Sequence, residues 1–405
     1  MLRAAKNSLT KSSSKYVFAR GISAALALIF AFFYSRVLGV ENRSILTFAM
    51  ATTLIMAIFF TSGTTLTFRK KFPREGSTDD ITVVMGLIII ESLLAAIGVL
   101  LSICIYSAFK TNLPKTFIIV VFVYSFFATL NLASIETILA IGKFNVAAIL
   151  EIITILIQIS IYTTMQYFKV SSIAIAILTS LIISYLVCQM SCWMLLISEN
   201  TGHLEKSIEP YLSFLKLTKH NHAYAISNGI VDRIDRVIIG WFLPLSLLGK
   251  FAVTTSLISY VRFIPDAIAK LIISKPQNDK KITTLRPSVP ATLLVISIVV
   301  STVLFSQLFI QFYFGSEWIL PILIPSLFAL QELARGFFQI ECSRFMVAGN
   351  EAVVAKQNLW MAVTAFLFCI FGVKVAGLYG VSVSLGLNYV LHTLLLHKQE
   401  RRWLA

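Results

Sequence analysis

Hydrophobic positions along the chain form long blocks rather than short periods. Apolar runs of about 20 residues recur from end to end, the length of helix that crosses the hydrocarbon core of a bilayer. Short polar or basic stretches separate the runs. The pattern predicts twelve membrane-spanning helices, near Val17–Leu38, Ser44–Phe68, Ile81–Tyr106, Thr116–Ile141, Val146–Phe168, Ser172–Leu196, Asn221–Leu243, Leu247–Ile273, Ser288–Tyr313, Pro321–Val347, Gln357–Val375 and Val381–Leu396.

The composition is also typical of a multi-pass membrane protein. Of the 405 residues, 57% are hydrophobic and 13% are charged, whereas soluble domains average about 25% charged. No separate soluble domain is predicted. Because no small-residue cleavage site follows the first apolar run, we interpret that run as a retained span rather than a signal peptide.

The formal net charge of +15 would suggest nucleic-acid binding in a soluble protein. Here the lysines and arginines are concentrated in alternate loops, as expected for loops retained in the cytoplasm and facing anionic lipid headgroups. We therefore expect both termini in the cytoplasm and no nucleic-acid partner. The five cysteines lie within apolar runs without a CxxC motif, so neither a disulfide framework nor a metal site is predicted.

The two halves of the chain resemble each other. The stretch Phe48–Ile55 is matched by Phe251–Ile258, 203 residues later. Six spans in each half would give both copies the same orientation, a plan that transporters use with the cargo site between the halves. We expect two six-helix bundles, residues 1–196 and 221–405, joined by an amphipathic cytoplasmic connection over residues 197–220.

Charged residues are least expected inside the hairpin predicted over residues 226–272. A charge at bilayer depth costs about 2.5–3.5 kcal/mol, so it usually faces a bundle interior or a wet cavity. Glu332 and Arg335 share one face of the tenth predicted span. Spacing alone leaves open a structural ion-pair network and a cavity lining, and we interpret the set as a cavity lining. The hairpin charges are Asp232, Arg233, Asp235, Arg236, Arg262, Asp266 and Lys270.

Two further charged residues lie within other predicted spans. Arg20 lies one turn inside the first span, where it could bind a phosphate group or extend to the headgroups. Glu91 lies deep in the third span, where a carboxyl group can bind a proton or a sodium ion. No nucleotide-binding or hydrolase motif is present, so we expect neither an enzyme nor a cofactor. An ion gradient or consumption of the cargo would supply the energy for transport.

Several motifs resemble those of polysaccharide exporters. DRIDRVIIGWFLPLSLLGKFAV (residues 232–253) is similar to a family motif with an R-x-D helix followed by I-G-x-F and L-G-x-[YF]-x-V. YSRVLGVENRSIL (residues 34–46) resembles the first-loop motif, with Ser44 where glycine is usual. FGSEW (residues 314–318) and GLYGVSVSLGLNY (residues 377–389) resemble later signatures. In order and spacing these motifs resemble the Wzx-type O-antigen and polysaccharide flippases, relatives of MATE drug exporters and lipid II flippases.

This resemblance implies an all-α, MATE-like protein of the bacterial inner membrane. Such proteins move an undecaprenyl-pyrophosphate-linked oligosaccharide to the periplasmic leaflet by alternating access, with Na⁺ or H⁺ as the coupling ion and a polysaccharide polymerase and chain-length regulator as partners. Guanidinium groups bind pyrophosphate by paired hydrogen bonds. The expected cargo contacts are Arg233, Arg236, Arg262, Arg335 and Arg20. The residues expected to tune charge or bind the ion are Asp232, Asp235, Asp266, Glu91 and Glu332.

Two alternatives from other classes stay open. A MATE-type drug exporter would share the spans and the half-repeat, but it would favour an acidic cavity over four deep arginines. A membrane polysaccharide polymerase or ligase would carry its catalytic groups in large exterior loops, whereas the predicted exterior loops are short. A lipid II flippase usually has more spans than this chain can form.

Overall fold

The computed structural model describes residues 2–75, 79–168, 172–199, 209–262, 265, 289–347 and 350–404, and within these ranges it contains helices and no strands. Contacts divide the chain into two units. The first comprises Met1–Gly39 and Ala49–Ile226, and the second comprises Val40–Phe48 and Ser227–Ala405. The second unit therefore includes a short segment from the N-terminal half of the chain.

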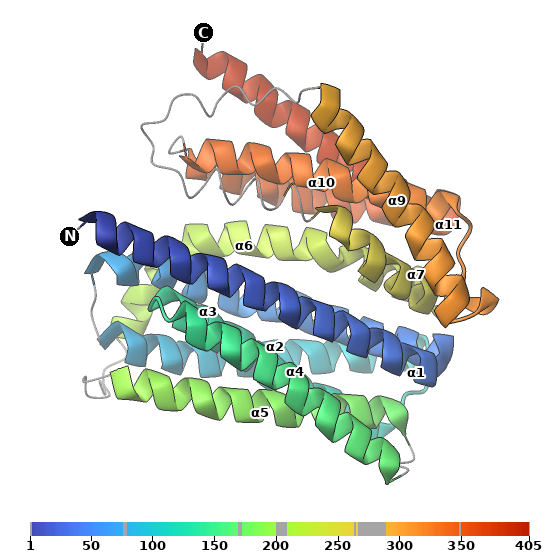
Figure 1. The fold of residues 1–405 in the computed structure, drawn as a ribbon, viewed down its shortest axis with the longest axis horizontal. Helices are drawn as coiled ribbons and strands as arrows, with labels where there is room; N and C mark the ends of the chain where they lie inside the picture. Colours follow the sequence, from blue (N-terminus) through green and yellow to red (C-terminus); the bar gives the residue numbers. More distant parts are fainter. Residues whose placement is uncertain are drawn as a thin grey trace. The chain divides into compact units, whose positions relative to one another are not determined.

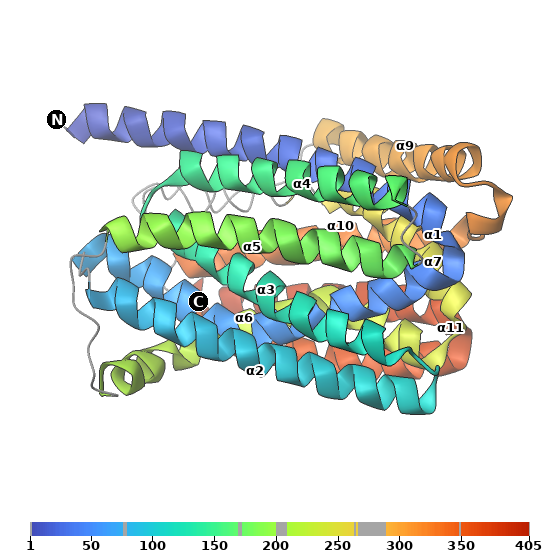
Figure 2. The same ribbon diagram turned by 90° about the horizontal axis from the view of Figure 1, so that it is seen from below.

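The first unit contains most of α1 (Leu2–Glu75), then α2 (Asp79–Phe109), α3 (Lys115–Ala140), α4 (Phe144–Tyr167), α5 (Ile173–Glu199) and the start of α6 (Glu209–Phe242). Helix α3 packs against both α2 and α5, and α4 crosses α5 obliquely (Figures 1 and 2). Apolar side chains fill the core, among them Leu87, Ile88, Ile138 and Cys192.

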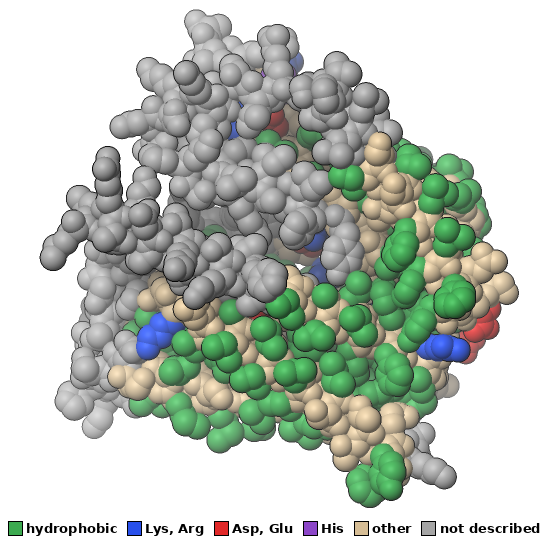
Figure 3. Space-filling model, viewed as in Figure 1, with side chains coloured by type: hydrophobic (Ala, Val, Ile, Leu, Met, Phe, Trp, Pro, Cys, Tyr) green, Lys and Arg blue, Asp and Glu red, His purple; other side chains and the backbone are tan. Residues whose placement is uncertain are grey.

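The outward faces of α4 and α5 are apolar. Ile153 and Leu156 of α4 are 42% and 48% exposed, and Met190 and Met194 of α5 are 56% and 64% exposed. Hydrophobic side chains dominate the described part of the face drawn in Figure 3. Continuous apolar exposure is unfavourable in water but is expected of helices that face lipid. Six helical stretches of the described chain are long and apolar enough to cross a membrane, and the protein is a multi-pass membrane protein.

Two of these six stretches contain a break. Helix α1 is interrupted at Gly39, which has φ 73° and ψ 172°, and α11 (Glu351–Leu404) is interrupted at Ala376 and Gly377, where φ of Gly377 is 59°. L-residues rarely adopt positive φ, so glycine permits both breaks. The sequence predicts a turn between spans at each position. Because α1 and α11 each supply two spans, the helices agree with about twelve crossings.

The second unit is built around α10 (Leu323–Val347), which lies along α11 (Figure 1). Helix α10 also contacts α7 (Leu245–Ile258), the 3₁₀ turn η1 (Ser259–Arg262) and α9 (Val289–Tyr313). A second 3₁₀ turn, η3 (Ser316–Trp318), follows α9. The two parts of α11 run back along each other, since the side-chain amide of Asn388 donates to the carbonyl oxygen of Met361 at 3.1 Å.

The segment of residues 40–48 packs against the turn between α6 and α7. The Ser44 hydroxyl donates to the carbonyl oxygen of Leu245, and the Phe48 ring meets the Trp241 ring edge to face at 6.4 Å. A Cβ atom at Gly249 would lie 2.8 Å from Oγ of Ser44, so glycine permits this close approach. The two exporter-like motifs at residues 34–46 and 232–253 therefore contact each other directly.

The largest differences from the predicted spans occur at α6 and α7. Helix α6 is continuous from Glu209, so it joins the end of the predicted connection to the predicted seventh span. Helix α7 ends at Ile258, well before the predicted end of the eighth span, and continues as η1. The Ser259 hydroxyl donates to the carbonyl oxygen of Ser256 at 3.0 Å, a local bond that competes with helical pairing.

Candidate functional site

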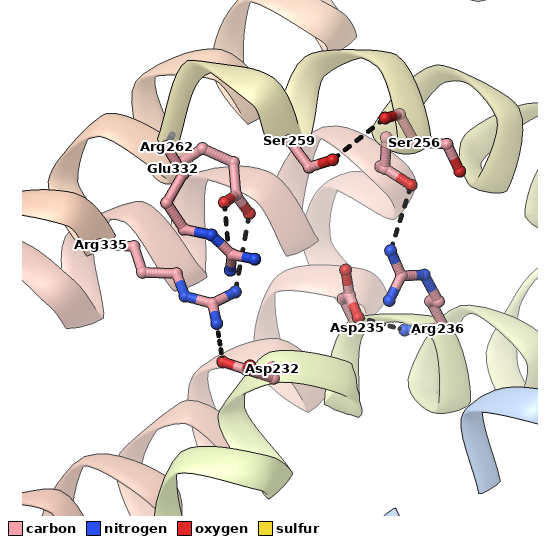
Figure 4. Close-up of polar contacts among 9 residues, drawn as sticks. Asp232, Asp235, Arg236, Ser256, Ser259, Arg262, Glu332 and Arg335 are labelled. Atoms are coloured by element: carbon pink, nitrogen blue, oxygen red, sulfur yellow. Dashed lines mark hydrogen bonds and ion pairs between the residues drawn. The ribbon is translucent and has the colours of Figure 1, made fainter. Parts of the chain in front are cut away.

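Charged side chains from three elements of the second unit meet in one ion-pair group. Arg335 of α10 is 6% exposed, and its Nη2 pairs with Oδ1 of Asp232 on α6. Its Nη1 lies 3.9 Å from Oε1 of Glu332. Oε2 of Glu332 lies 3.7 Å from Nη1 of Arg262 at the end of η1. Glu332 therefore stands between two guanidinium groups (Figure 4).

Helix geometry and close packing assemble this group. Glu332 and Arg335 are one turn apart on α10, so their side chains project from the same face. The residue after Arg335 is Gly336, where a Cβ atom would lie 2.6 Å from Cγ of Pro265. Glycine therefore lets the chain that follows η1 approach α10, which brings Arg262 within reach of Glu332.

The burial of this group makes its pairing important. Glu332 is only 3% exposed, and an unpaired carboxylate at such a depth would be strongly unfavourable. The expected pair of Glu332 and Arg335 is present. The closer partner of Arg335 is Asp232, which the sequence did not predict because the two residues are 103 positions apart.

A second polar group lies one turn farther along α6. Asp235 is 4% exposed, and its Oδ1 accepts the backbone N–H of Arg236 at 2.7 Å. The Arg236 guanidinium donates a long hydrogen bond of 3.4 Å to the hydroxyl of Thr255 on α7. Figure 4 shows these residues beside the ion-pair group.

Two of the four arginines lack a close carboxylate. Within the described ranges, no carboxylate oxygen lies within 4.0 Å of a guanidinium nitrogen of Arg233 or Arg236. Arg233 is half-buried and lies in the field of Asp232, Asp235 and Arg335. With Glu332 included, the described group has four arginines and three carboxylates, so it carries a formal positive excess. A partly buried positive excess attracts anions.

Three of the predicted charged positions lie outside the described residues. These are Asp266, Lys270 and the side chain of Arg20. The expected row formed by Arg262, Asp266 and Lys270 therefore stays a prediction. The described partner of Arg262 is Glu332 of α10 rather than a residue of its own helix.

Glu91 belongs to the first unit rather than to this group. It lies on α2, is 8% exposed, and accepts through Oε1 a hydrogen bond from the hydroxyl of Thr64 on α1. Its Oε2 has no hydrogen-bond partner in the described chain. A buried carboxyl group with one free oxygen can hold a proton or contribute one ligand to a cation.

Sequence reasoning missed the neutral polar partners. Thr255 binds Arg236, and Tyr389 of α11 interacts electrostatically with Arg335 while its ring lies 6.1 Å from that of Phe338. Formal charge was the criterion, and these residues carry none. The available signal was the polar triplet of Asn388, Tyr389 and His392 within an apolar run.

The fold is similar to those of several solved membrane transporters. The lipid II flippase MurJ in an inward closed conformation matches with a TM-score of 0.75 and 15% identity, covering 95% of this chain and 87% of that chain. An inward-facing multidrug resistance MATE family transporter of the MOP superfamily matches with 0.65 and 13%, covering 93% and 94%. The Vibrio cholerae MATE transporter VcmN matches with 0.63 and 11%, covering 99% and 98%. The chain therefore has the all-α, MATE-like fold that the sequence predicted.

The sequence itself identifies the family. A family model described as polysaccharide biosynthesis protein matches residues 7–322, so the chain belongs to this family. Among curated proteins, none matches the sequence. The predicted relationship to polysaccharide exporters is thereby confirmed at the level of family and fold.

Proposed function

We propose that this protein is a flippase that moves an undecaprenyl-pyrophosphate-linked oligosaccharide across the bacterial inner membrane. The cargo passes from the cytoplasmic to the periplasmic leaflet by alternating access and is not changed covalently. Both termini lie in the cytoplasm. Membership of a polysaccharide biosynthesis family and a transporter fold support this proposal together. A polysaccharide polymerase and a chain-length regulator are the proposed partners that receive the cargo.

The unequal pairing of the arginines carries the proposal. Arg262 and Arg335 have carboxylate partners, whereas Arg233 and Arg236 have none within 4.0 Å in the described chain. A guanidinium group without a counter-ion is unfavourable in a membrane helix, and an anionic ligand would supply the missing charge. Pyrophosphate suits this role because its oxygens accept paired hydrogen bonds from guanidinium groups. Arg233 and Arg236 would therefore contact the cargo first.

The paired arginines join the site in a second step of the proposal. When a proton or a sodium ion neutralises Asp232 or Glu332, the attraction that holds Arg335 and Arg262 weakens. These guanidinium groups then become available to the pyrophosphate, so ion binding and cargo binding favour each other. Asp235 and Asp266 would tune the charge of the group, and Arg20 is a further proposed phosphate contact. Glu91 is the coupling-ion candidate in the first unit.

A MATE-type exporter of cationic drugs is the main alternative with the same fold. It would need a site with negative excess, whereas the described group has four arginines and three carboxylates. A membrane polymerase or ligase would also fit a polysaccharide biosynthesis family. The similarity to transporters over nearly the whole chain favours transport over these enzymes.

Complementation of a deletion strain tests the proposal. Wild type, Arg236→Ala/Arg262→Ala and the control Arg344→Ala are expressed at equal levels. Arg344 is a suitable control because it pairs with Glu341 on α10 at 2.9 Å, outside the ion-pair group. We expect the double variant to lose surface polysaccharide and to accumulate lipid-linked oligosaccharide in the cytoplasmic leaflet, while the control exports normally. Normal export by the double variant would refute the site assignment.

A further inference from the structure

A buried network of neutral polar side chains joins the two parts of α11. Nε2 of Gln357 lies 2.6 Å from Nδ1 of His392, and the Thr364 hydroxyl lies 2.9 Å from Nε2 of the same ring. The Thr364 hydroxyl also lies 2.6 Å from Oδ1 of Asn388. His392 is 2% exposed, Gln357 is 6% exposed and Asn388 is fully buried. Both ring nitrogens of a membrane-buried histidine are therefore paired.

The hydrogen-bond donors determine the tautomer of His392. The Asn388 amide nitrogen donates to the carbonyl oxygen of Met361, which turns Oδ1 of Asn388 toward Thr364. Two oxygens 2.6 Å apart need a proton between them, and only the Thr364 hydroxyl can supply it. Because that proton is used, Nε2 of His392 must donate to the Thr364 oxygen. Nδ1 then accepts from Gln357, and the imidazole is neutral with its proton on Nε2.

The same network can also pair a protonated ring. A proton added at Nδ1 needs an acceptor, and rotation of the Gln357 amide by half a turn replaces its NH₂ group with Oε1. Gln357 then accepts from Nδ1 while Nε2 still donates to Thr364. A reversible exchange of one amide orientation therefore lets His392 gain or lose a proton without leaving a buried nitrogen unpaired. A purely structural bridge would not need a partner that serves both forms.

No charged side chain of the described residues pairs with His392. The surrounding charged and titratable groups are Lys356 and Cys369 on the first part of α11, Tyr389 and His397 on its second part, and Glu332, Arg335, Glu341, Cys342 and Arg344 on α10. Glu341 pairs with Arg344, and Glu332 pairs with Arg335. An imidazolium cation would therefore sit among neutral groups, so this conformation favours release of the proton.

Helix α11 links the network to the arginine group. Tyr389 precedes His392 by one turn and interacts electrostatically with Arg335. A charge that appears on His392 acts on this same turn of α11. From this geometry we infer that His392, held between Gln357 and Thr364, is a proton-binding site that couples a proton gradient to movement of the anionic cargo. The coupling part of this inference rests on the proposed flippase function.

The test has one readout that does not depend on transport. Protein labelled with ¹⁵N-histidine is reconstituted in liposomes, and solid-state NMR follows the imidazole signals from pH 8 to pH 5. The His392 signal is the one missing from His392→Gln. We expect a neutral ring with its proton on Nε2 at high pH and a doubly protonated ring at low pH. In Gln357→Met, which offers no acceptor, the neutral form should persist. A ring that stays neutral at every pH in the wild type would overturn the proton site.

The second readout measures coupling in proteoliposomes with a fluorescent polyprenyl-pyrophosphate oligosaccharide. We expect a pH gradient to accelerate wild-type translocation. His392→Gln should translocate at one rate with or without the gradient, and the exposed-position control His397→Gln should respond like wild type. Acceleration of His392→Gln by the gradient, or no acceleration of wild type, would overturn the coupling. A wild type that moves no probe under any condition would instead contradict the proposed function, and the NMR titration would still decide the proton site.

Discussion

Replacing Arg335 by glutamine tests whether the ion-pair group holds the second unit together. Two unit charges 4 Å apart attract by about 4 kcal/mol at an effective dielectric constant of 20. Arg335 faces Glu332 at 3.9 Å and pairs with Asp232 as well. Desolvation opposes this attraction, but removal of one partner leaves buried carboxylates uncompensated and costs about 3–5 kcal/mol. Because the Asp232 side chain is 35% exposed and partly screened, we expect a loss of about 3 kcal/mol.

Reversible unfolding in mixed SDS and detergent micelles measures this loss as a free energy of unfolding. The matched control is Arg344→Gln on the same helix. Arg344 and Glu341 also pair at i, i+3, at 2.9 Å, but their side chains are 21% and 18% exposed. The control should therefore lose less than about 1 kcal/mol.

A double-mutant cycle isolates the contact between α6 and α10. Arg335→Gln combined with Asp232→Asn should be less destabilising than the sum of the single changes, with a coupling energy of about 1–3 kcal/mol. Equal losses for Arg335→Gln and Arg344→Gln, or simple additivity in the cycle, would refute the reasoning.

The remaining predictions concern the first unit and the α11 hairpin. Glu91→Gln keeps the acceptor for the Thr64 hydroxyl, so it should leave thermal stability unchanged but reduce ion-driven transport in proteoliposomes, whereas Glu136→Gln should leave transport unchanged. Gly380→Ala would place a methyl group against the Gly372 carbonyl, so overpacking should cost about 1–3 kcal/mol of unfolding free energy. Gly386→Ala is the control, because its nearest described neighbour lies at an ordinary 3.7 Å; equal stability of the two alanine variants would contradict the packing argument.

Hydropathy predicted most of the helices because lipid-facing helices must be apolar along their length. The fourth span, predicted as Thr116–Ile141, is α3 at Lys115–Ala140. The polar stretch before Val17 hid the true start of α1 at Leu2. Polar composition alone does not end a helix, and a glycine with positive φ or a proline does so more reliably. Gly39, Gly377 and Pro244 mark such ends or breaks here.

The candidate site was predictable in its members but not in its pairs. A charge within an apolar run is conspicuous, so Arg335 and Glu332 could be selected from the sequence. The contact between Arg335 and Asp232 depends on how α6 packs against α10, which local spacing does not determine. The pairing of His392 with Gln357 was hidden for the same reason, because 35 residues and the break in α11 separate the two side chains.

Translocation by the purified protein tests the central claim most directly. Proteoliposomes receive a fluorescent undecaprenyl-pyrophosphate oligosaccharide in both leaflets, and a membrane-impermeant quencher reports the fraction that reaches the outer leaflet after the outer pool is quenched. We predict rapid loss of the protected fraction with wild type and Arg344→Gln, and a stable protected fraction with Arg233→Gln/Arg236→Gln. Equal rates for wild type and this double variant would contradict the claim that the unpaired arginines bind the anionic cargo.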